Sequence, residues 1–378
     1  MDLVNQLPVA ASVRAAPVEG APYRFGLVTA KATFRFDSSG RITQETQKPR
    51  PLLKTDEPTP FGLLPGDLQP RRDPAFEVMI LGQAHAPRPT PSLTVALAVG
   101  DVRRELRVSG ERVWHGQGPQ AAMTRPQPFE RMPLTWDRAF GGSHPVYVDR
   151  ESIIDVSHPI NKYGKGFDVE AMARSIAQSW KAPAGFPVLP GYQRALPNLE
   201  DPQKPVRSWD DSPEPTCWAP IPLEVPLRAG RLADEQAKRA SRRGWPQAET
   251  DPLASIDGPP PDLEENYLRA HPDWVIALPP AGALVRLENL HADAAVIEFR
   301  LPQLHLVADW SINGGTGRLP LAPQVLMLLP EENTFYIVFR ASFMFDFERG
   351  KERCLRLRSE KGWFQPARRE PELSPAGR

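Results

Sequence analysis

Residues that could carry out catalysis are scattered through this sequence, and none forms a recognised catalytic motif. No G-x-S-x-G segment is present, so the nucleophile elbow of the common serine hydrolases is missing. The GKGF fragment at 164–167 has the Gly-Lys pair of a phosphate-binding loop but lacks the hydroxyl residue that would hold magnesium. The glycine-rich run at 314–317 lacks the preceding strand and following helix that dinucleotide binding requires. We therefore expect no catalytic residues and no bound organic cofactor.

Residues that ligate metals also fail to cluster. The chain has 7 histidines and 2 cysteines, without H-x-H, H-E-x-x-H or C-x-x-C spacing. The nearest approach to a ligand set is His144 and His158, with Asp149 and Asp155 between them. Isolated side chains of these types on loops usually form local hydrogen bonds instead. We expect no metal site.

The charged residues do not indicate nucleic-acid binding. The 46 basic and 46 acidic residues cancel, whereas an electrostatic nucleic-acid binder needs clustered positive charge. Short basic pairs at 71–72, 242–243 and 368–369 are far apart and typical of a solvated face. The adjacent acids Asp210 and Asp211 could form a glycosidase-like pair, which depends on a carboxyl separation that only a structure can give.

The sequence also favours a reducing, aqueous compartment. No apolar run approaches the roughly 20 residues that span a membrane. The first residues lack the basic region that opens a signal peptide. Cys217 and Cys354 are isolated, as in a reduced cytosolic protein. We expect a cytoplasmic protein without membrane insertion.

Proline is the compositional outlier. The 45 prolines are about twice the usual share of roughly 5%. Each interior proline removes a helix hydrogen bond, which argues against a helix bundle. The 9 Trp, 6 Tyr and 16 Phe argue against disorder. The composition predicts a β protein with long, ordered loops.

Period-two alternation predicts strands in the first third of the chain. Between 28 and 37, apolar residues fill one face, and Lys31, Thr33 and Arg35 are on the other, which predicts a strand with one face in water. A turn at 38–40 and a returning strand at 41–46 should follow. Alternation at 93–99, the Gly100-Asp101 pair and 102–108 predict a hairpin. A further strand is expected at 76–84.

Strands return in the last third. Between 295 and 301, apolar residues alternate with Glu298 and Arg300. Further strands are expected at 304–310, 324–329, 334–340 and 342–348, with a turn at 314–317.

The proline-rich middle contains the helix signals. The clearest is 168–180, where Asp168 can cap the helix and Val169, Met172, Ile176 and Trp180 fall on one stripe. Weaker helices are expected at 232–243 and from residue 262 onward.

These patterns predict a mainly β fold, with sandwich-like β regions at both ends framing a proline-rich, irregular middle with two or three short helices. The expected divisions are an N-terminal β region at 1–116, the middle at 117–270, a C-terminal β region at 271–350 and a flexible tail at 364–378. A single globular domain over 20–350 is the alternative.

The segment at 128–142 has a composition that is unusual for a loop. It interleaves large apolar residues such as Trp136 and Phe140 with Arg131, Asp137 and Arg138, and it ends at a glycine pair. Aromatic residues at this density usually belong to a core. We therefore expect an ordered structural clamp, and the alternative is a partner contact built from the same residue types.

This segment resembles the family known as domain of unknown function 2169. The sequences NKYGKGF, ALPNLEDP and GERVWHG resemble further motifs of that family, with Lys162 in place of a proline and Glu111 in place of an aspartate. The run near Gly230 departs from the family pattern. The resemblance extends from about residue 25 to 345. The residues that carry it, with structural or partner-binding roles implied, are Trp114, Phe129, Pro133, Trp136, Arg138, Phe140, Gly141, Gly142, Asn161, Gly164, Lys165, Gly166, Phe167, Pro197, Asn198 and Glu200.

The resemblance implies a cytoplasmic adaptor or chaperone of the bacterial type VI secretion system. Such a protein would bind a PAAR-containing effector before secretion, and the VgrG spike is a second candidate partner. The alternatives are a structural tail- or baseplate-like module and an enzyme of unrecognised type. An adaptor should expose apolar surface or an open strand edge, whereas an enzyme should gather titratable groups in one pocket.

Overall fold

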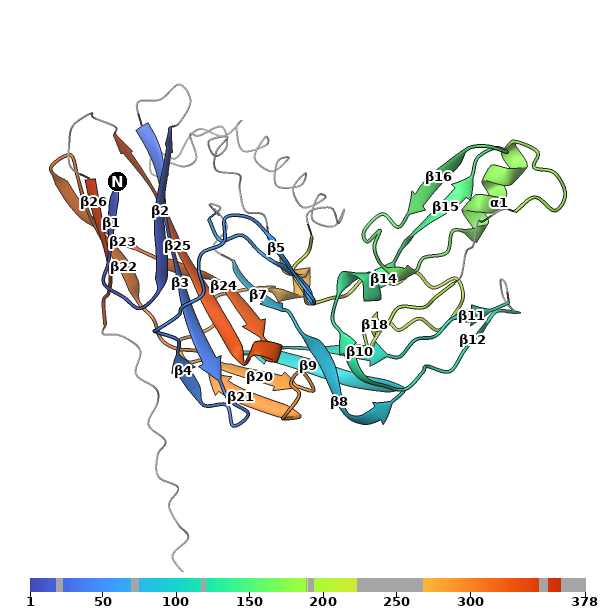
Figure 1. Cartoon of the computed structure of the whole chain (residues 1–378), viewed down its shortest axis with the longest axis horizontal. Helices are drawn as coiled ribbons and strands as arrows, with labels where there is room; N and C mark the ends of the chain where they lie inside the picture. The colour runs from blue at the N-terminus through green and yellow to red at the C-terminus, as the bar shows by residue number, and fades with distance from the viewer. Residues whose placement is uncertain are drawn as a thin grey trace, which may run out of the picture.

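The structure is a computed structural model that describes residues 1–17, 23–68, 75–116, 120–187, 189, 194–222, 268–346 and 353–361. Strands dominate these residues, and the expected mainly β fold is confirmed (Figure 1). Three larger sheets are accompanied by two-stranded ribbons and, within the described ranges, one α-helix. None of the helices described is long and apolar enough to cross a membrane.

The largest sheet has seven strands and combines both ends of the chain. Its order is β19-β7-β24-β25-β3-β2, with β4 pairing the far end of β3. The central pair, β25 and β3, runs antiparallel over 13 residue pairs, from Thr334 opposite Arg35 to Asp346 opposite Tyr23. The strands are β2 (Ala10–Pro17), β3 (Tyr23–Phe36), β4 (Ile42–Gln44), β7 (Phe76–Ile80), β19 (Val275–Ile276), β24 (Ala322–Leu329) and β25 (Thr334–Asp346).

The five-stranded sheet has the order β18-β10-β9-β20-β21 and also joins distant segments. Its β9–β10 hairpin turns at Gly100, as the sequence predicted. In β21 the apolar side chains alternate with exposed Glu298 and Arg300, again as predicted. The strands are β9 (Ser92–Val99), β10 (Val102–Ser109), β18 (Leu199–Glu200), β20 (Leu284–Glu288) and β21 (Val296–Arg300).

A four-stranded sheet of order β1-β26-β22-β23 completes the larger sheets. Its strands are β1 (Asp2–Asn5), β22 (Leu306–Ile312), β23 (Gly315–Pro320) and β26 (Arg353–Ser359). The ribbons pair β5 (Glu57–Thr59) with β6 (Gly62–Leu64), β8 (Gln83–Thr90) with β13 (Phe129–Pro133), β11 (Trp114–His115) with β12 (Ala122–Met123), β14 (Phe140–Gly141) with β17 (Lys165–Gly166), and β15 (Ser143–Tyr147) with β16 (Ile153–Ser157). Helix α1 spans Glu170–Ser179, and 3-10 turns span Trp136–Arg138, Pro272–Trp274 and Pro330–Glu332.

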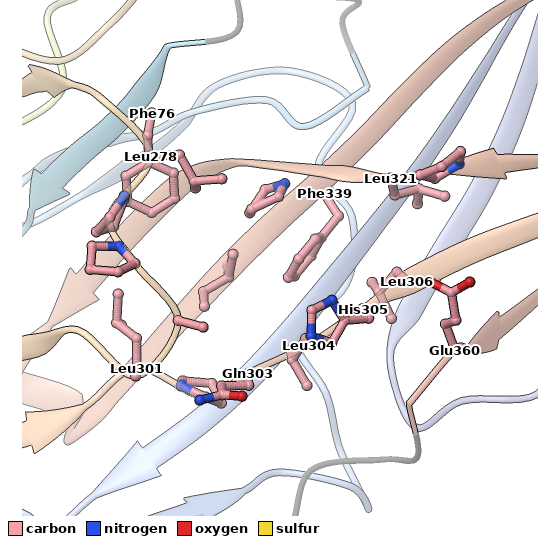
Figure 2. A pocket seen from close by; sticks show the side chains of 18 of the residues that line it. Phe76, Leu278, Leu301, Gln303, Leu304, His305, Leu306, Leu321, Phe339 and Glu360 are labelled. Carbon is pink, nitrogen blue, oxygen red and sulfur yellow. The ribbon is translucent and has the colours of Figure 1, made fainter.

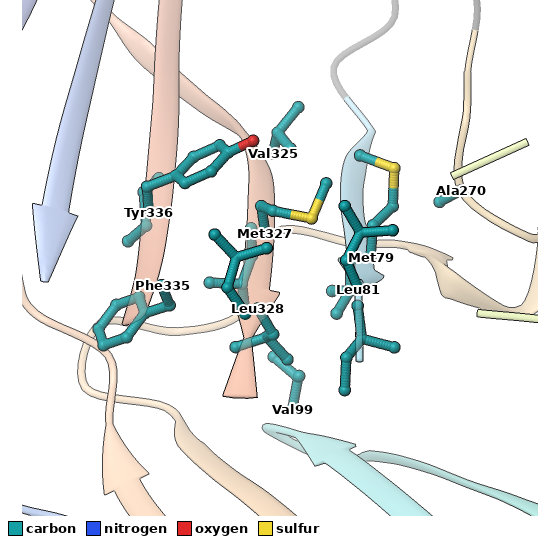
Figure 3. Packing of buried hydrophobic residues seen from close by; sticks show 14 of the residues in the cluster. Met79, Leu81, Val99, Ala270, Val325, Met327, Leu328, Phe335 and Tyr336 are labelled. Carbon is teal, nitrogen blue, oxygen red and sulfur yellow. The ribbon is translucent and has the colours of Figure 1, made fainter. Parts of the chain in front are cut away.

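One hydrophobic core links the three sheets. Phe34 and Phe335 stack at 5.1 Å across β3 and β25, and Phe335 stacks on Phe299 of β21 at 4.8 Å. This row of rings joins the seven-stranded sheet to the five-stranded one. Figure 3 shows a second row, in which Tyr336, Met327 and Met79 lie side by side on β25, β24 and β7, in agreement with the strand register.

The face of β3 predicted to lie in water is instead mostly buried. Lys31 and Thr33 are 1% and 2% exposed, and only Arg35 of the predicted polar face is exposed within the strand. The loop after β4 covers this face: Lys31 Nζ donates to the carbonyl of Pro51 at 3.0 Å and forms an ion pair with Asp67. The prediction that this face of the strand lies in water was wrong, because a loop distant in sequence supplies partners for its polar groups.

Other elements differ in detail from the sequence-based expectation. The strands predicted at 334–340 and 342–348 are one strand, β25, while β1, β2 and β26 were not predicted. On α1 the buried stripe runs through Val169 and Ala173, and Met172 is 48% exposed. The helices expected at 232–243 and from residue 262, and the tail at 364–378, lie outside the described residues.

A small lobe projects from the sheets on the right of Figure 1. It consists of the β15–β16 ribbon and α1, over residues 143–180. The lobe has its own core of Val146, Val156, Val169 and Ala173, separate from the main hydrophobic cluster. Its attachment to the sheets therefore depends on the residues at its base.

Candidate functional site

Most of the motif residues lie where the lobe meets the sheets. Three pairings bring their segments together: β14 runs parallel to β17, β18 pairs with β10, and Ala139 bridges to Leu199. Segments 91 positions apart in sequence thus meet, since Val108 on β10 pairs with Leu199 on β18. We call this region the lobe base.

Asn161 is the central hydrogen-bonding residue of the lobe base. It is fully buried, and its side-chain amide donates to the carbonyls of Trp136 at 2.8 Å and Phe140 at 3.0 Å. Its own carbonyl accepts the amide of Gly142 at 2.8 Å. One side chain therefore satisfies two buried carbonyls of the 128–142 segment that have no ladder partner there.

The glycines of the motifs are required by close approach and by backbone conformation. Gly141 and Gly142 have φ of 139° and 131°, and Gly166 has φ of 99°. A Cβ on Gly141 would collide with the backbone of Asn161, and a Cβ on Gly164 would collide with the backbone at Ala139. Only glycine allows these chains to pack so closely without strain.

Two cations of the motifs converge on one carboxylate. Glu111 Oε1 accepts Arg138 Nη1 at 3.0 Å, and Glu111 Oε2 accepts Lys165 Nζ at 3.0 Å. Both cations also donate to Oδ1 of Asn198 at 3.1 Å. Asn198 is fully buried and donates to the carbonyl of Ser109 at 3.0 Å. The cluster thus joins the lobe to β10 through ion pairs that face solvent on one side.

This arrangement shifts the titration of Glu111. Partial burial favours its neutral form, but the hydrogen bonds and charges of Lys165 and Arg138 outweigh burial and hold the pKa of Glu111 below its ordinary value. The Lys165 side chain is therefore part of an ion-pair network rather than of a phosphate-binding loop.

A buried ion pair lies beneath this cluster. Arg112 and Glu200 are 4% and 3% exposed, and Arg112 Nη2 lies 2.5 Å from Glu200 Oε2. Arg112 also donates to the carbonyl of Pro197 at 3.2 Å, and Glu200 accepts the amide of Val206 at 2.9 Å. Burying this pair is tolerated because each ion has further hydrogen-bond partners.

The large aromatic residues of the motifs are mostly packing groups. Trp136 is 4% exposed, and its indole Nε1 donates to the carbonyl of Ala219 at 3.1 Å. Phe140 is 2% exposed and meets the His158 ring edge-on at 5.3 Å, and His158 meets Phe167 at 5.2 Å. Trp114 is half-buried, with the guanidinium of Arg194 5.7 Å from its ring. Phe129 and Pro133 begin and end β13.

Four of the groups weighed for catalysis and metal binding make local hydrogen bonds: Asp149, His158, Asp210 and Asp211. Nδ1 of His158 accepts the amide of Asn161 at 3.1 Å, and Asp149 accepts the amides of Glu151 and Ser152 at 2.8 and 2.7 Å. Asp211 accepts the amides of its own turn, from Arg207 at 2.7 Å and Ser208 at 2.8 Å, and Asp210 bonds to the Ser208 hydroxyl. No group of three or more His, Cys, Asp or Glu that could hold a metal occurs in the described part of the chain.

Burial also shifts the titration of Cys217, His144 and His158. It raises the pKa of the Cys217 thiol to about 12, and Cys217 donates to the carbonyl of Leu134 at 3.4 Å. Burial lowers the pKa of His144 and of His158 below the ordinary value. These groups are stabilised in their neutral forms, the thiol as an inert core residue.

Sequence reasoning missed two residues of the lobe base, Arg112 and Arg194, and considered His158 only as a metal ligand. Arg112, His158 and Arg194 are each less than 9% exposed and make the contacts given above. Glu111 was noted only as a departure from a motif. Their closeness to the motifs could have identified them. Glu111 and Arg112 lie within the GERVWHG motif, and Arg194 directly precedes the ALPNLEDP motif.

The outer surface of the lobe is apolar at several points. Ile153 and Ile154 of β16 are 48% and 46% exposed, Tyr163 is 44% exposed, and Met172 of α1 is 48% exposed. These side chains offer apolar contact area to another protein, on more than one side of the lobe because Ile153 and Ile154 are neighbours on one strand and face opposite ways.

Comparison with known proteins gives one result. A family model described as "Uncharacterized protein conserved in bacteria (DUF2169)" matches residues 23–340. No curated protein and no solved structure matches the chain.

Proposed function

Because this chain belongs to the DUF2169 family, we propose that it is an adaptor of the bacterial type VI secretion system. In this proposal it binds a PAAR-containing effector in the cytoplasm, helps to load that effector on the VgrG spike, and remains in the cell. The family resemblance of the motifs suggests this role, and the geometry of the lobe is compatible with it.

The observation that carries the proposal is the exposed apolar surface of the lobe. Ile153, Ile154 and Met172 expose nearly half of their surfaces, while the lobe beneath them has its own core. An apolar surface on a projecting, packed element suits a protein partner, because burying it on binding contributes roughly 25 cal/mol per Å² before the costs of association.

The lobe base supports the same role. Arg138 and Lys165 are tied to Glu111, and Asn161 and Asn198 are buried and hydrogen-bonded. Groups held in this way fix the position of the lobe. A lobe held in one orientation loses less entropy on binding than a mobile one.

The test is deletion of the gene in a bacterium that carries the secretion system. We expect the abundance and delivery of one PAAR-containing effector to fall, because a client without its adaptor exposes apolar surface to proteases. The deleted strain complemented with the gene is the control. Unchanged effector abundance and delivery would contradict the adaptor role.

A further inference from the structure

We propose that β23 is a docking edge, to which an extended segment of the effector adds as a further strand and places a large apolar side chain in the adjacent pocket. This inference rests on the proposed function, since the segment belongs to the effector that the adaptor would carry.

The first observation is the free edge of the four-stranded sheet. β23 is the last strand in the order β1-β26-β22-β23, and no described strand pairs with its outer side. By contrast, the edge strand β21 of the five-stranded sheet is approached by the turn after β3, where Gly40 lies against the backbone of Glu298. An open edge offers unpaired backbone groups to an extended peptide.

The hairpin geometry identifies which backbone groups of β23 point outward. Asn313 and Gly314 have φ of 52° and 84°, so they form a two-residue turn of the type in which both central residues have positive φ. In such a hairpin the flanking pair, Ile312 and Gly315, exchanges hydrogen bonds, and alternate pairs follow. The amide of Leu321 donates to the carbonyl of Leu306 at 2.9 Å, which agrees with this alternation.

The backbone groups of Thr316 and Arg318 therefore face away from β22. Both residues are exposed. Pro320 occupies the next outward position and has no amide to donate, so strand addition would reach its limit there. An added strand would pair with Thr316 and Arg318 and then leave the sheet at Pro320.

Charge along the sheet indicates the kind of segment. Arg356 of β26, Asp309 of β22 and Arg318 of β23 are opposite one another in register, which gives a row of alternating charge. Arg318 ends the row at the free edge, and its contacts with Asp309 and Glu360 are long, at 3.5 and 3.4 Å. An acidic residue opposite Arg318 in an added strand would continue the alternation. We infer an acidic segment.

A pocket lies at the Pro320 end of the strand. Figure 2 shows its walls, with Leu278 and Leu301 at one end and Leu321 and Glu360 at the other. Its volume is about 250 Å³, slightly below the roughly 300–1,000 Å³ of pockets that enclose drug-sized ligands. The apolar lining and this size suit a single large apolar side chain better than a small-molecule substrate.

The experiment is hydrogen–deuterium exchange of the full chain, alone and in complex with the PAAR-containing effector that co-purifies with it. We expect the amides of Thr316 and Arg318 to exchange at least about 10-fold more slowly in the complex, because they would donate hydrogen bonds to carbonyls of the added strand. The amide of Gly317, which points toward β22, is the internal control and should change much less.

Two pairs of variants then test binding. Arg318→Pro removes the outward amide while leaving the ladder with β22 intact, as Pro320 does two residues later, and Arg318→Ala keeps the amide. We expect Arg318→Pro to weaken effector binding at least about 10-fold and Arg318→Ala about 3-fold or less. Leu278→Asp at the pocket should also weaken binding about 10-fold or more, whereas Leu284→Asp, exposed outside the pocket lining, should not.

The outcomes separate this inference from the function on which it rests. A complex that forms without slower exchange at Thr316 and Arg318 would overturn the docking edge and leave the adaptor role standing. Full-strength binding by a folded Arg318→Pro variant would do the same. If no PAAR-containing effector forms a complex with the wild-type chain, both proposals are overturned.

Discussion

The side-chain amide of Asn161 donates to the backbone carbonyl of Phe140 at 3.0 Å, across 21 residues of sequence. The same amide donates to Trp136, so a residue after the β15–β16 ribbon holds the segment that precedes that ribbon. The two ends of the lobe are thereby tied together where they meet the sheets.

We predict that Asn161→Ala loosens the lobe. The substitution leaves the buried carbonyl of Phe140 without this donor, at roughly 1–3 kcal/mol for an unsatisfied group, whereas the carbonyl of Trp136 still accepts the amide of Ala139 at 3.3 Å. Amide hydrogen exchange should become faster over 143–180 under conditions in which exchange in β3 and β25 is unchanged. Tyr163→Ala, at an exposed neighbouring position, is the control. Equal exchange in wild type and Asn161→Ala would show that the lobe is held by other contacts.

Trp136→Ala should destabilise the whole protein. Trp136 is 4% exposed and belongs to the main core, so its removal should lower the free energy of unfolding by roughly 3–5 kcal/mol. Trp136→Phe, which keeps most of the packing and loses only the hydrogen bond to Ala219, should lower it less. Denaturant unfolding without any partner measures both. A normal unfolding curve with lost effector binding would make this residue a contact site instead of a clamp.

Glu111 should stabilise the protein at neutral pH and not in acid. Its folded-state pKa lies below the ordinary value of 4.5 because Lys165 and Arg138 outweigh the effect of burial. A depressed carboxyl pKa gives stability that is complete above the unfolded pKa and is lost as pH falls through the folded pKa.

Glu111→Gln should therefore lower the melting temperature at pH 7, and the difference should shrink as pH falls below 4.5 and through the lower pKa of folded Glu111. The effect should be modest in size, because the Glu111 side chain is 47% exposed. Melting curves of both proteins across this range provide the test. A difference that grows toward acid pH would contradict the assigned role of the ion pairs.

The buried pair of Lys31 and Asp67 should behave as a coupled unit. The two side chains are 1% and 3% exposed, and the amide of Leu53 donates to Asp67 at 2.7 Å. Lys31→Met alone leaves a buried carboxylate unpaired, at roughly 3–5 kcal/mol. Adding Asp67→Asn removes that charge and keeps an acceptor for Leu53. We expect the double variant to recover more than half of the lost stability in denaturant unfolding. Additive losses would show that the two residues do not interact.

Local sequence patterns predicted the regular strands well. The β9–β10 hairpin follows from alternation on both sides of Gly100-Asp101, and the inward residues of β21 follow from period two. The same signal was present in β26, where Leu355 and Leu357 alternate with Arg356 and Arg358, and it was overlooked. The burial of Lys31 could not be predicted, because the carboxylate that pairs with it is 36 positions away on a loop with no regular pattern.

The sequence predicted which segments form the site but not how those segments are arranged in space. The motifs around Trp136, Asn161 and Asn198 were identified in the sequence, but their convergence depends on the parallel pairing of β14 with β17 and on the bridge from Ala139 to Leu199. Pairings between two-residue strands leave almost no trace in a hydrophobic pattern. The same holds for the apolar surface of the lobe, because Met172 fits a helical stripe and yet is exposed.

The central claim is that the lobe contacts the effector, and the affinity of a lobe variant tests it most directly. The double variant Ile154→Asp/Met172→Asp replaces two exposed apolar side chains, and Val296→Asp replaces one of similar exposure on β21. Titration calorimetry with the purified PAAR-containing effector should show binding at least about 10-fold weaker for the lobe variant and unchanged for the control, with all melting temperatures alike. Binding by the lobe variant as tight as that of the wild type would contradict the account.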